Sequence, residues 1–285
     1  MMQRKVFLLK HVIGYLIGFL LFYEPFMFFQ RLTSGFLVET GFASIHVPCA
    51  RIPLANILTG QWQYSGPNSL FFCLLLIVTS LWFGPIFCGW LCPAGASSEY
   101  LSKLLPDKYK IDWAKMVPVV PLRYGFFLGF LSSIVLGLGI PCGYCNYYAL
   151  ELFVGYVHTG QLLSGSISLL ATFVVTNILL GLFTKGGRGY CNLLCPVGTM
   201  CSIFHVLGYF VPGSFGIEIE EAKCVGCGLC TKQCPMRAIS LIDRKAKINR
   251  HHCIVCGQCA MACPKNAISY ASNVSKEEQD NDSKA

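Results

Sequence analysis

Four runs of apolar residues divide the first two thirds of the chain, at residues 12–29, 70–87, 124–140 and 167–183. Each run approaches the roughly 20 residues that a helix needs to cross a hydrocarbon core about 30 Å thick. Glu24 and Pro25 interrupt the first run, and we place them near a membrane boundary. A shorter apolar stretch at residues 201–211 predicts an interfacial or buried helix. The pattern therefore predicts four transmembrane helices.

The distribution of basic residues predicts how these helices are oriented. Of the 22 Lys and Arg residues, only Arg31 and Arg51 lie between the first and second runs, and none lies at residues 141–166. Cytoplasmic loops carry the excess of basic residues in membrane proteins. Basic residues also precede the first run, as in a signal peptide, but no small-residue cleavage site follows it. We therefore expect a multi-pass protein of the cytoplasmic membrane with both termini in the cytoplasm.

The chain changes character after residue 212. Residues 213–272 form a compact basic segment with one-turn helices expected after each group of cysteines. Short strands are expected near residues 216–219, 239–242 and 247–249. Residues 273–285 are small and charged, which predicts a disordered tail. The predicted fold is an α-helical membrane domain at residues 1–212, built from two repeated helix pairs, followed by an α+β domain like a bacterial ferredoxin.

Composition agrees with this organisation. Hydrophobic residues make up 54% of the 285 residues and charged residues only 13%, about half the usual share of roughly 25%. Such a composition excludes a disordered chain, a coiled coil and a typical cytosolic enzyme. The net charge of +8 follows the predicted topology, so we expect no nucleic-acid partner. The 17 cysteines are too widely spread for a small disulfide scaffold and point to metal ligands.

Two copies of one cysteine motif carry the strongest chemical signal. The first copy is Cys224, Cys227, Cys230 and Cys234 before Pro235, and the second, 29 positions later, is Cys253, Cys256, Cys259 and Cys263 before Pro264. Three cysteines at this spacing wrap a loop around a four-iron cube, and the fourth ligates the other cube. We assign one 4Fe-4S cluster to Cys224, Cys227, Cys230 and Cys263, and the second to Cys253, Cys256, Cys259 and Cys234.

The alternatives for these eight cysteines are zinc knuckles and disulfides. Four zinc ligands would explain neither the third cysteine at fixed spacing nor the two prolines. Disulfides are disfavoured in a cytoplasmic domain. The motifs therefore favour a two-cluster ferredoxin domain that conducts electrons.

A second repeated motif, Cys-x3-Cys-Pro (CxxxCP), follows the second and fourth apolar runs. Its copies are Cys88 and Cys92 before Pro93, and Cys191 and Cys195 before Pro196. If the two helix pairs are related by an axis along the membrane normal, the four cysteines converge near that axis. They would then bind an additional cluster or metal, or relay electrons as thiols; the plain alternative is packing of helix ends. Spacing alone does not choose between an iron–sulfur cluster, zinc and Cu(I).

Other cysteines give weaker signals. Cys142 and Cys145 lie on the predicted outer face and form a redox-active dithiol, half of a metal site or a local disulfide. Cys49, with His46 nearby, would complete such a site only if two long loops met.

Cys73 and Cys201 stand alone in the sequence and predict core packing. Glu24, Glu151 and His158 are candidates for quinol ligands or proton acceptors, because ionisable groups in or near a membrane often have functions. The bland alternative for each is a solvated loop residue. The chain has no dinucleotide-binding, Walker A, haem-attachment or nucleophile-elbow motif, which argues against nicotinamide chemistry and nucleotide hydrolysis.

Together these features resemble the NapH-type membrane ferredoxins, whose core recurs in the NosR, CcoG and MauN-like families. The resemblance rests on the four apolar runs, the two CxxxCP motifs and the C-terminal two-cluster domain, and it covers nearly the whole chain. It implies quinol oxidation at the membrane and electron delivery to a partner iron–sulfur protein and a terminal reductase. The Cys142 and Cys145 pair is not part of the family pattern.

The leading functional hypothesis is a membrane electron-transfer subunit that oxidises quinol, with lipid and the quinone pool as partners. Cubane potentials vary over a wide range, so low-potential clusters would instead carry electrons from a cytoplasmic donor into the membrane. A second hypothesis is a maturation factor that reduces a metal or thiols for a partner enzyme. A third is a redox-sensing regulator. The complete set of cluster motifs, with no metallochaperone or sensory domain beside it, favours the first.

Overall fold

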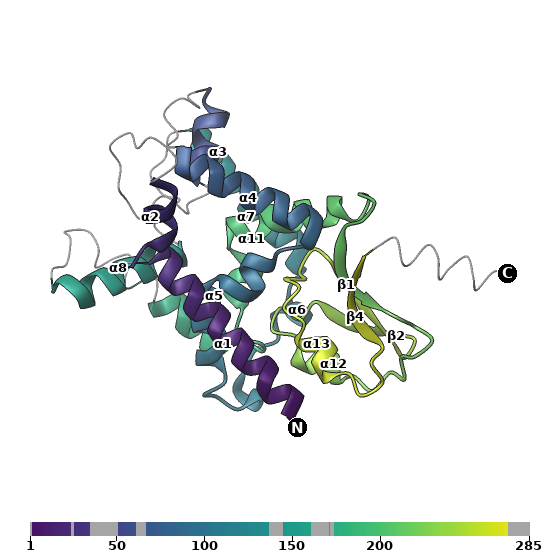
Figure 1. The fold of residues 1–285 in the computed structure, drawn as a ribbon. Coiled ribbons are helices and arrows are strands. Elements are labelled where there is room, and N and C mark those ends of the chain that lie inside the picture. The colour runs from purple at the N-terminus through teal and green to yellow at the C-terminus, as the bar shows by residue number, and fades with distance from the viewer. Residues whose placement is uncertain are drawn as a thin grey trace.

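The computed structural model describes residues 2–23, 26–34, 51–60, 67–136, 145–160, 171 and 174–272. A helical part, residues 2–208, packs beside a small C-terminal lobe, residues 215–272, that contains all four strands of the described chain (Figure 1).

The helical part is built from short helices joined by tight turns. Its α-helices are α1 (Met2–Phe22), α2 (Phe28–Ser34), α3 (Arg51–Leu58), α4 (Pro67–Phe83), α5 (Pro93–Ser102), α6 (Trp113–Met116), α7 (Val119–Val135), α8 (Asn146–Thr159), α10 (Gly189–Leu193) and α11 (Pro196–Gly208). Two π-helices, η2 (Phe87–Leu91) and η5 (Asn177–Leu182), and one 3-10 turn, η3 (Asp107–Tyr109), complete it. The helix expected near residues 201–211 is confirmed as α11, and its residues Met200, Cys201 and His205 are buried.

The prediction of four transmembrane helices, and with it the predicted fold class, is wrong for the part of the chain that the structure describes. There, no helix combines the length and the apolar character needed to cross a bilayer. α4 and α7 have 17 residues each and are therefore about 25 Å long, short of a core about 30 Å thick. The fourth apolar run is described at residue 171 and from residue 174 onward, where it forms η5.

The CxxxCP motifs are helix starts. Cys92 and Cys195 occupy the N-cap positions of α5 and α11 with extended backbone, and the following proline is the first residue of each helix. Proline suits that position because its fixed φ is helical and its missing N–H would have no partner there. The proline of each motif thus fixes where a new helix begins, immediately after the second cysteine.

The C-terminal lobe contains two antiparallel strand pairs. β1 (Phe215–Ile219) pairs with β4 (Ile268–Ser272), with Ile217 opposite Tyr270, and β2 (Ile239–Ile242) pairs with β3 (Lys245–Ile248). The three predicted strands are confirmed to within two residues, whereas β4 was not predicted. Two short helices, α12 (Leu229–Gln233) and α13 (Gln258–Ala262), lie inside the two cysteine motifs.

Side chains from three separate helical elements hold the loop at residues 251–256 of the lobe. His11 in α1 donates from Nε2 to the carbonyl of Cys256 at 2.8 Å, and Trp90 in η2 donates to the carbonyl of Val255 at 3.2 Å. Arg123 in α7 donates to the carbonyl of His251 at 2.7 Å. The lobe is therefore docked on the helical part through the backbone of its second cysteine motif.

This docking leaves no room for a side chain at Gly89 in η2. A Cβ there would overlap the carbonyl oxygen of Ile254 and lie 3.3 Å from the Cα of Cys256. We expect Gly89→Ala to lower the free energy of unfolding by about 1–3 kcal/mol, because backbone on both sides must move. Gly129→Ala in α7 is the control: a Cβ there meets nothing within 4 Å, and alanine favours the helix. Urea unfolding followed by circular dichroism measures both changes, and equal midpoints for the two variants would contradict the expectation.

Candidate metal centres

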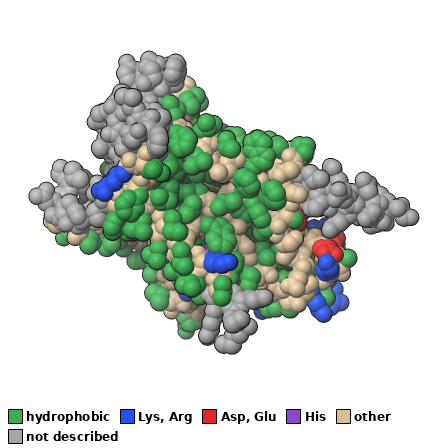
Figure 2. All heavy atoms as spheres, in the orientation of Figure 1, with side chains coloured by type: hydrophobic (Ala, Val, Ile, Leu, Met, Phe, Trp, Pro, Cys, Tyr) green, Lys and Arg blue, Asp and Glu red, His purple; other side chains and the backbone are tan. Residues whose placement is uncertain are grey.

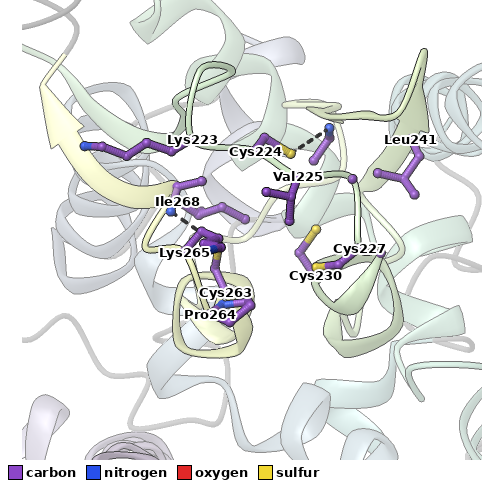
Figure 3. Close-up of a pocket in the computed structure, with 14 residues that line it drawn as sticks. Lys223, Cys224, Val225, Cys227, Cys230, Leu241, Cys263, Pro264, Lys265 and Ile268 are labelled. Carbon is purple, nitrogen blue, oxygen red and sulfur yellow. Dashed lines mark hydrogen bonds between the residues drawn. The ribbon is translucent and has the colours of Figure 1, made fainter.

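The structure gathers the eight cysteines of the repeated motif into two cavities. Cavity A is lined by Cys224, Cys227, Cys230 and Cys263 (Figure 3). Cavity B is lined by Cys234, Cys253, Cys256 and Cys259. Each cavity therefore takes three cysteines from one motif and the fourth from the other. The cysteines assigned to one cluster from the sequence lie around one cavity, while ligation itself remains a prediction.

Backbone amides point at the cysteine sulfurs of both cavities. In cavity A, the N–H groups of Ala246 and Ala267 donate to the Sγ atoms of Cys224 and Cys263, at 3.4 and 3.3 Å. In cavity B, the N–H of Ala238 donates to Sγ of Cys234 at 3.2 Å. Amide hydrogen bonds stabilise the negative charge of a thiolate and tune the potential of a bound cluster. The residues present therefore fit iron–sulfur clusters.

Among the described residues, no three His, Cys, Asp or Glu side chains meet closely enough to share one metal ion. The four cysteines of each cavity instead lie around its wall.

The two cavities differ in their access to solvent. Cys227 of cavity A is exposed, whereas the four cysteines of cavity B are 7–8% exposed and belong to the core of the lobe. Burial raises the pKa of Cys253 and of Cys259 to about 12. Cavity A therefore faces outward and cavity B faces the helical part.

The structure also brings the four CxxxCP cysteines (Cys88, Cys92, Cys191 and Cys195) together. Burial raises the pKa of Cys195, and the neighbouring thiols of the other three raise it further. Burial likewise raises the pKa of Cys92 to about 11 and that of Cys191 to about 12. Cys88 and Cys191 pack against the core that contains cavity B. The four CxxxCP cysteines therefore lie together, as the repeat led us to expect, between the first residues of the helices and the lobe.

Cys201 belongs to this group as well, although its position in the sequence suggested an isolated core residue. It is fully buried in α11, as predicted, and shares a hydrogen bond with Cys88. Accepting that bond lowers the pKa of Cys201, while donating it raises the pKa of Cys88. Cys73 is buried in the adjacent core, in agreement with its prediction.

A buried ion pair that the sequence reasoning missed supports the CxxxCP cysteines. Arg188, 1% exposed, donates to Oε2 of Glu99 at 2.8 Å, to the carbonyl of Cys88 at 2.7 Å and to the hydroxyl of Tyr15 at 2.7 Å. The other carboxylate oxygen of Glu99 accepts from Gln258 in α13 at 2.9 Å. Burial disfavours the charged carboxylate, but Arg188 holds the pKa of Glu99 below its usual value. The position of Arg188, between two glycines and three residues before Cys191, was the feature of the sequence that could have indicated this ion pair.

Arg123 is a second buried guanidinium beside the same cysteines. It donates to Oγ1 of Thr199 at 3.1 Å, within α11, and to the carbonyl of His251. Burial raises the pKa of Cys191, and the charges of Arg188 and Arg123 act in the opposite direction. Arg123 therefore adds positive charge beside these cysteines, and no carboxylate of the described residues pairs with it.

The structure describes only some of the weaker candidates. Cys145 is the N-cap residue of α8, and Glu151 and His158 lie in the same helix, Glu151 with its side chain buried. Cys142, Cys49, His46 and Glu24 lie outside the described residues.

Comparisons with known proteins match both cysteine-rich parts of the chain. A family model described as "4Fe-4S binding domain" matches residues 65–112 and 166–216, the segments that hold the CxxxCP cysteines. A model described as "4Fe-4S dicluster domain" matches residues 216–278, which contain cavities A and B. The chain is also 30% identical over 214 residues to the uncharacterized protein MJ0749 of Methanocaldococcus jannaschii, covering 74% of this chain and 71% of that protein. The chain belongs to the family of MJ0749.

Two other relatives of this MJ0749 family member carry descriptive names. The putative electron transport protein YccM of Escherichia coli is 25% identical over 64% of the chain, which spans half of YccM. The regulatory protein NosR of Pseudomonas aeruginosa is 25% identical over 74% of the chain, which spans 30% of NosR. The family member thus carries 4Fe-4S ferredoxin-type domains, with homology to proteins of the YccM and NosR type.

Proposed function

We propose that this iron–sulfur protein relays electrons between a donor bound near its helical part and a partner at the C-terminal lobe. The observation that carries the proposal is the packing of Cys88 and Cys191 against the core that contains cavity B. Bound 4Fe-4S clusters supply one-electron transfer at potentials set by their surroundings. In this proposal electrons pass between three sites of the chain, in the order of the CxxxCP cysteines, buried cavity B and outward-facing cavity A.

A third cluster at the CxxxCP cysteines is part of this proposal. Four buried sulfurs beside a buried guanidinium suit an anionic cluster, because a four-iron cube ligated by four thiolates carries negative charge. Arg123 supplies positive charge there, whereas the charge of Arg188 is already balanced by Glu99. Backbone amides help as well: the N–H of Gly198 donates to Sγ of Cys195 at 3.3 Å.

We further propose a NapH-type role, in which quinol is the electron donor. Support comes from a cleft of about 620 Å³ between the segment at residues 112–121 and the lobe. Asp112 lines the cleft, is 9% exposed and pairs through one oxygen with Arg237 at 2.6 Å, while its Oδ1 has no partner among the described residues. His252, next to Cys253, lines the same cleft. A small organic donor in this cleft would lie close to cavity B, because Ala238 and Ile239 line both.

We also propose that the surface of the helical part contacts lipid at the cytoplasmic membrane. Large apolar side chains lie exposed along the helical part, among them Leu9 (59%), Leu74 (59%) and Leu128 (62%) (Figure 2). Apolar patches of this kind mark protein or membrane contacts. We propose an iron–sulfur protein and a terminal reductase as the partners that receive the electrons.

The test is reduction of the purified, cluster-loaded chain by a reduced menaquinol analogue in liposomes, followed by EPR under anaerobic conditions. We expect cluster signals to appear with quinol, and Asp112→Asn to slow their appearance about tenfold because the loss of the carboxylate charge breaks its pair with Arg237 at the wall of the cleft. Reduction by dithionite, which does not use the cleft, should proceed at the same rate in both proteins. Clusters that respond to dithionite but stay silent with quinol would exclude quinol as the donor and favour a cytoplasmic donor or a maturation role.

A further inference from the structure

Cavity A opens on a surface whose centre is apolar. Around exposed Cys227, the side chains of Val225, Leu229 and Leu241 are 57%, 46% and 42% exposed. Val225 and Leu241 lie on either side of Cys227 in the view of cavity A (Figure 3). We call this surface, with the cations described next, the cavity A face. Exposed apolar side chains around a redox centre are suited to contact with another protein.

Basic residues surround this apolar centre. Lys265 lines cavity A, and Arg244 lies with its backbone against Gly226, which also lines the cavity. Both side chains are exposed and form no ion pair with the rest of the described chain. Two further exposed cations, Lys223 and Lys247, are paired with Glu220 at 2.7 Å and Glu221 at 3.9 Å. Cations therefore outnumber carboxylates on the cavity A face, even with Asp243 beside Arg244.

We propose that the cavity A face docks an acidic redox protein that exchanges single electrons with the centre at Cys224, Cys227, Cys230 and Cys263. This inference rests on the proposed function, because it assumes a cluster in cavity A. In the exchange one electron leaves the reduced partner or the reduced chain and reduces the other, and no bond forms or breaks. Complementary charge at the rim speeds encounter and fixes orientation, while the small apolar centre allows close approach.

An acidic protein suits this surface better than an anionic membrane. The large exposed apolar side chains that would enter lipid lie on α1, α4 and α7, whereas charged side chains gather on the lobe (Figure 2). The cavity A face also retains Glu220 and Glu221, and these carboxylates would be repelled by a uniformly anionic lipid surface. A protein can place its acidic residues opposite Arg244 and Lys265 individually.

The experiment uses the full chain with its clusters and a reduced, acidic plant-type 2Fe-2S ferredoxin as the probe, mixed in a stopped-flow instrument. We expect the second-order rate constant to fall at least about tenfold between low and physiological salt, since screening weakens charge steering. Arg244→Glu and Lys265→Glu should each lower it about three- to tenfold at low salt. Lys108→Glu in η3 makes the same change in net charge away from the face and should alter the rate less than about twofold.

The inference is overturned if the rate is independent of salt, or if Lys108→Glu is as slow as the other two variants. It is also overturned if the face variants lose binding to vesicles rich in anionic lipid while ferredoxin kinetics stay unchanged, because lipid would then be the occupant. Iron content and dithionite-reduced EPR spectra separate this failure from that of the proposed function. Missing cavity A signals would refute the relay itself, whereas normal signals with unsteered kinetics would refute only the docking.

Discussion

Cys256→Ala is expected to abolish the cavity B cluster and remove about four iron atoms from a total of about twelve per chain. Cys256 is 7% exposed at the centre of the core of the lobe, and no other described cysteine lines cavity B beyond Cys234, Cys253 and Cys259. Because the lobe encloses cavity B within its core, we also expect a loss of folding free energy comparable to that of losing a structural metal. Iron and sulfide analysis with EPR on anaerobically purified protein measures the change.

Two matched variants serve as controls for Cys256→Ala. Cys73→Ala removes an equally buried cysteine that lies in the other core, and its iron content should equal that of the natural chain. Cys191→Ala should remove about four iron atoms if the CxxxCP cysteines hold a third cluster, and none if the total is about eight. An unchanged iron content in Cys256→Ala would refute the assignment of cavity B.

Arg188→Met is expected to lower the free energy of unfolding by about 3–5 kcal/mol, because it leaves the buried Glu99 carboxylate without its buried cationic partner, with only the half-exposed Lys103 at 3.4 Å. Both side chains are nearly inaccessible, at 1% and 3% exposure, so solvent screens their interaction little. The substitution also removes the hydrogen bonds to the carbonyl of Cys88 and the hydroxyl of Tyr15. Chemical unfolding of the cluster-loaded protein, monitored by circular dichroism and by cluster absorbance, gives the value.

The double variant Arg188→Met with Glu99→Leu tests the cause. Replacing a buried ion pair by apolar residues of similar size is often neutral in stability, whereas breaking one half is costly. We therefore expect the double variant to be more stable than Arg188→Met alone. A double variant that is less stable than either single change would show that the pair acts through its other hydrogen bonds, such as that from Gln258 to Glu99.

The C-terminal lobe was largely predictable from sequence because its constraints are local. Cysteines three apart, a proline after the fourth and a repeat 29 positions later determine how each loop wraps. The strand β4 was missed because its alternating pattern is short and its partner β1 lies some 50 positions earlier in the chain. Pairings at that separation leave little trace in a single sequence.

The helical part was mispredicted because hydropathy counts apolar residues without locating helix ends. The second run continues to residue 87, but α4 ends at Phe83, and Gly84 then takes a φ of +74° that most residues avoid. A Cβ at Gly84 would also lie 2.8 Å from Val255, so the lobe itself requires glycine there. The buried ion pair of Arg188 and Glu99 was equally hidden, since its residues are 89 positions apart.

The hydrogen bond from His11 to the carbonyl of Cys256 has a consequence for biosynthesis. Its two residues are 245 positions apart, so α1 must wait for a further 245 residues to be synthesised before its partner exists. At synthesis rates of about 5–20 residues per second, that interval lasts on the order of ten to fifty seconds. During that interval the lobe cannot cover the part of α1 that carries His11. The contact between α1 and the lobe therefore forms only after the loop that contains Cys256 has been synthesised.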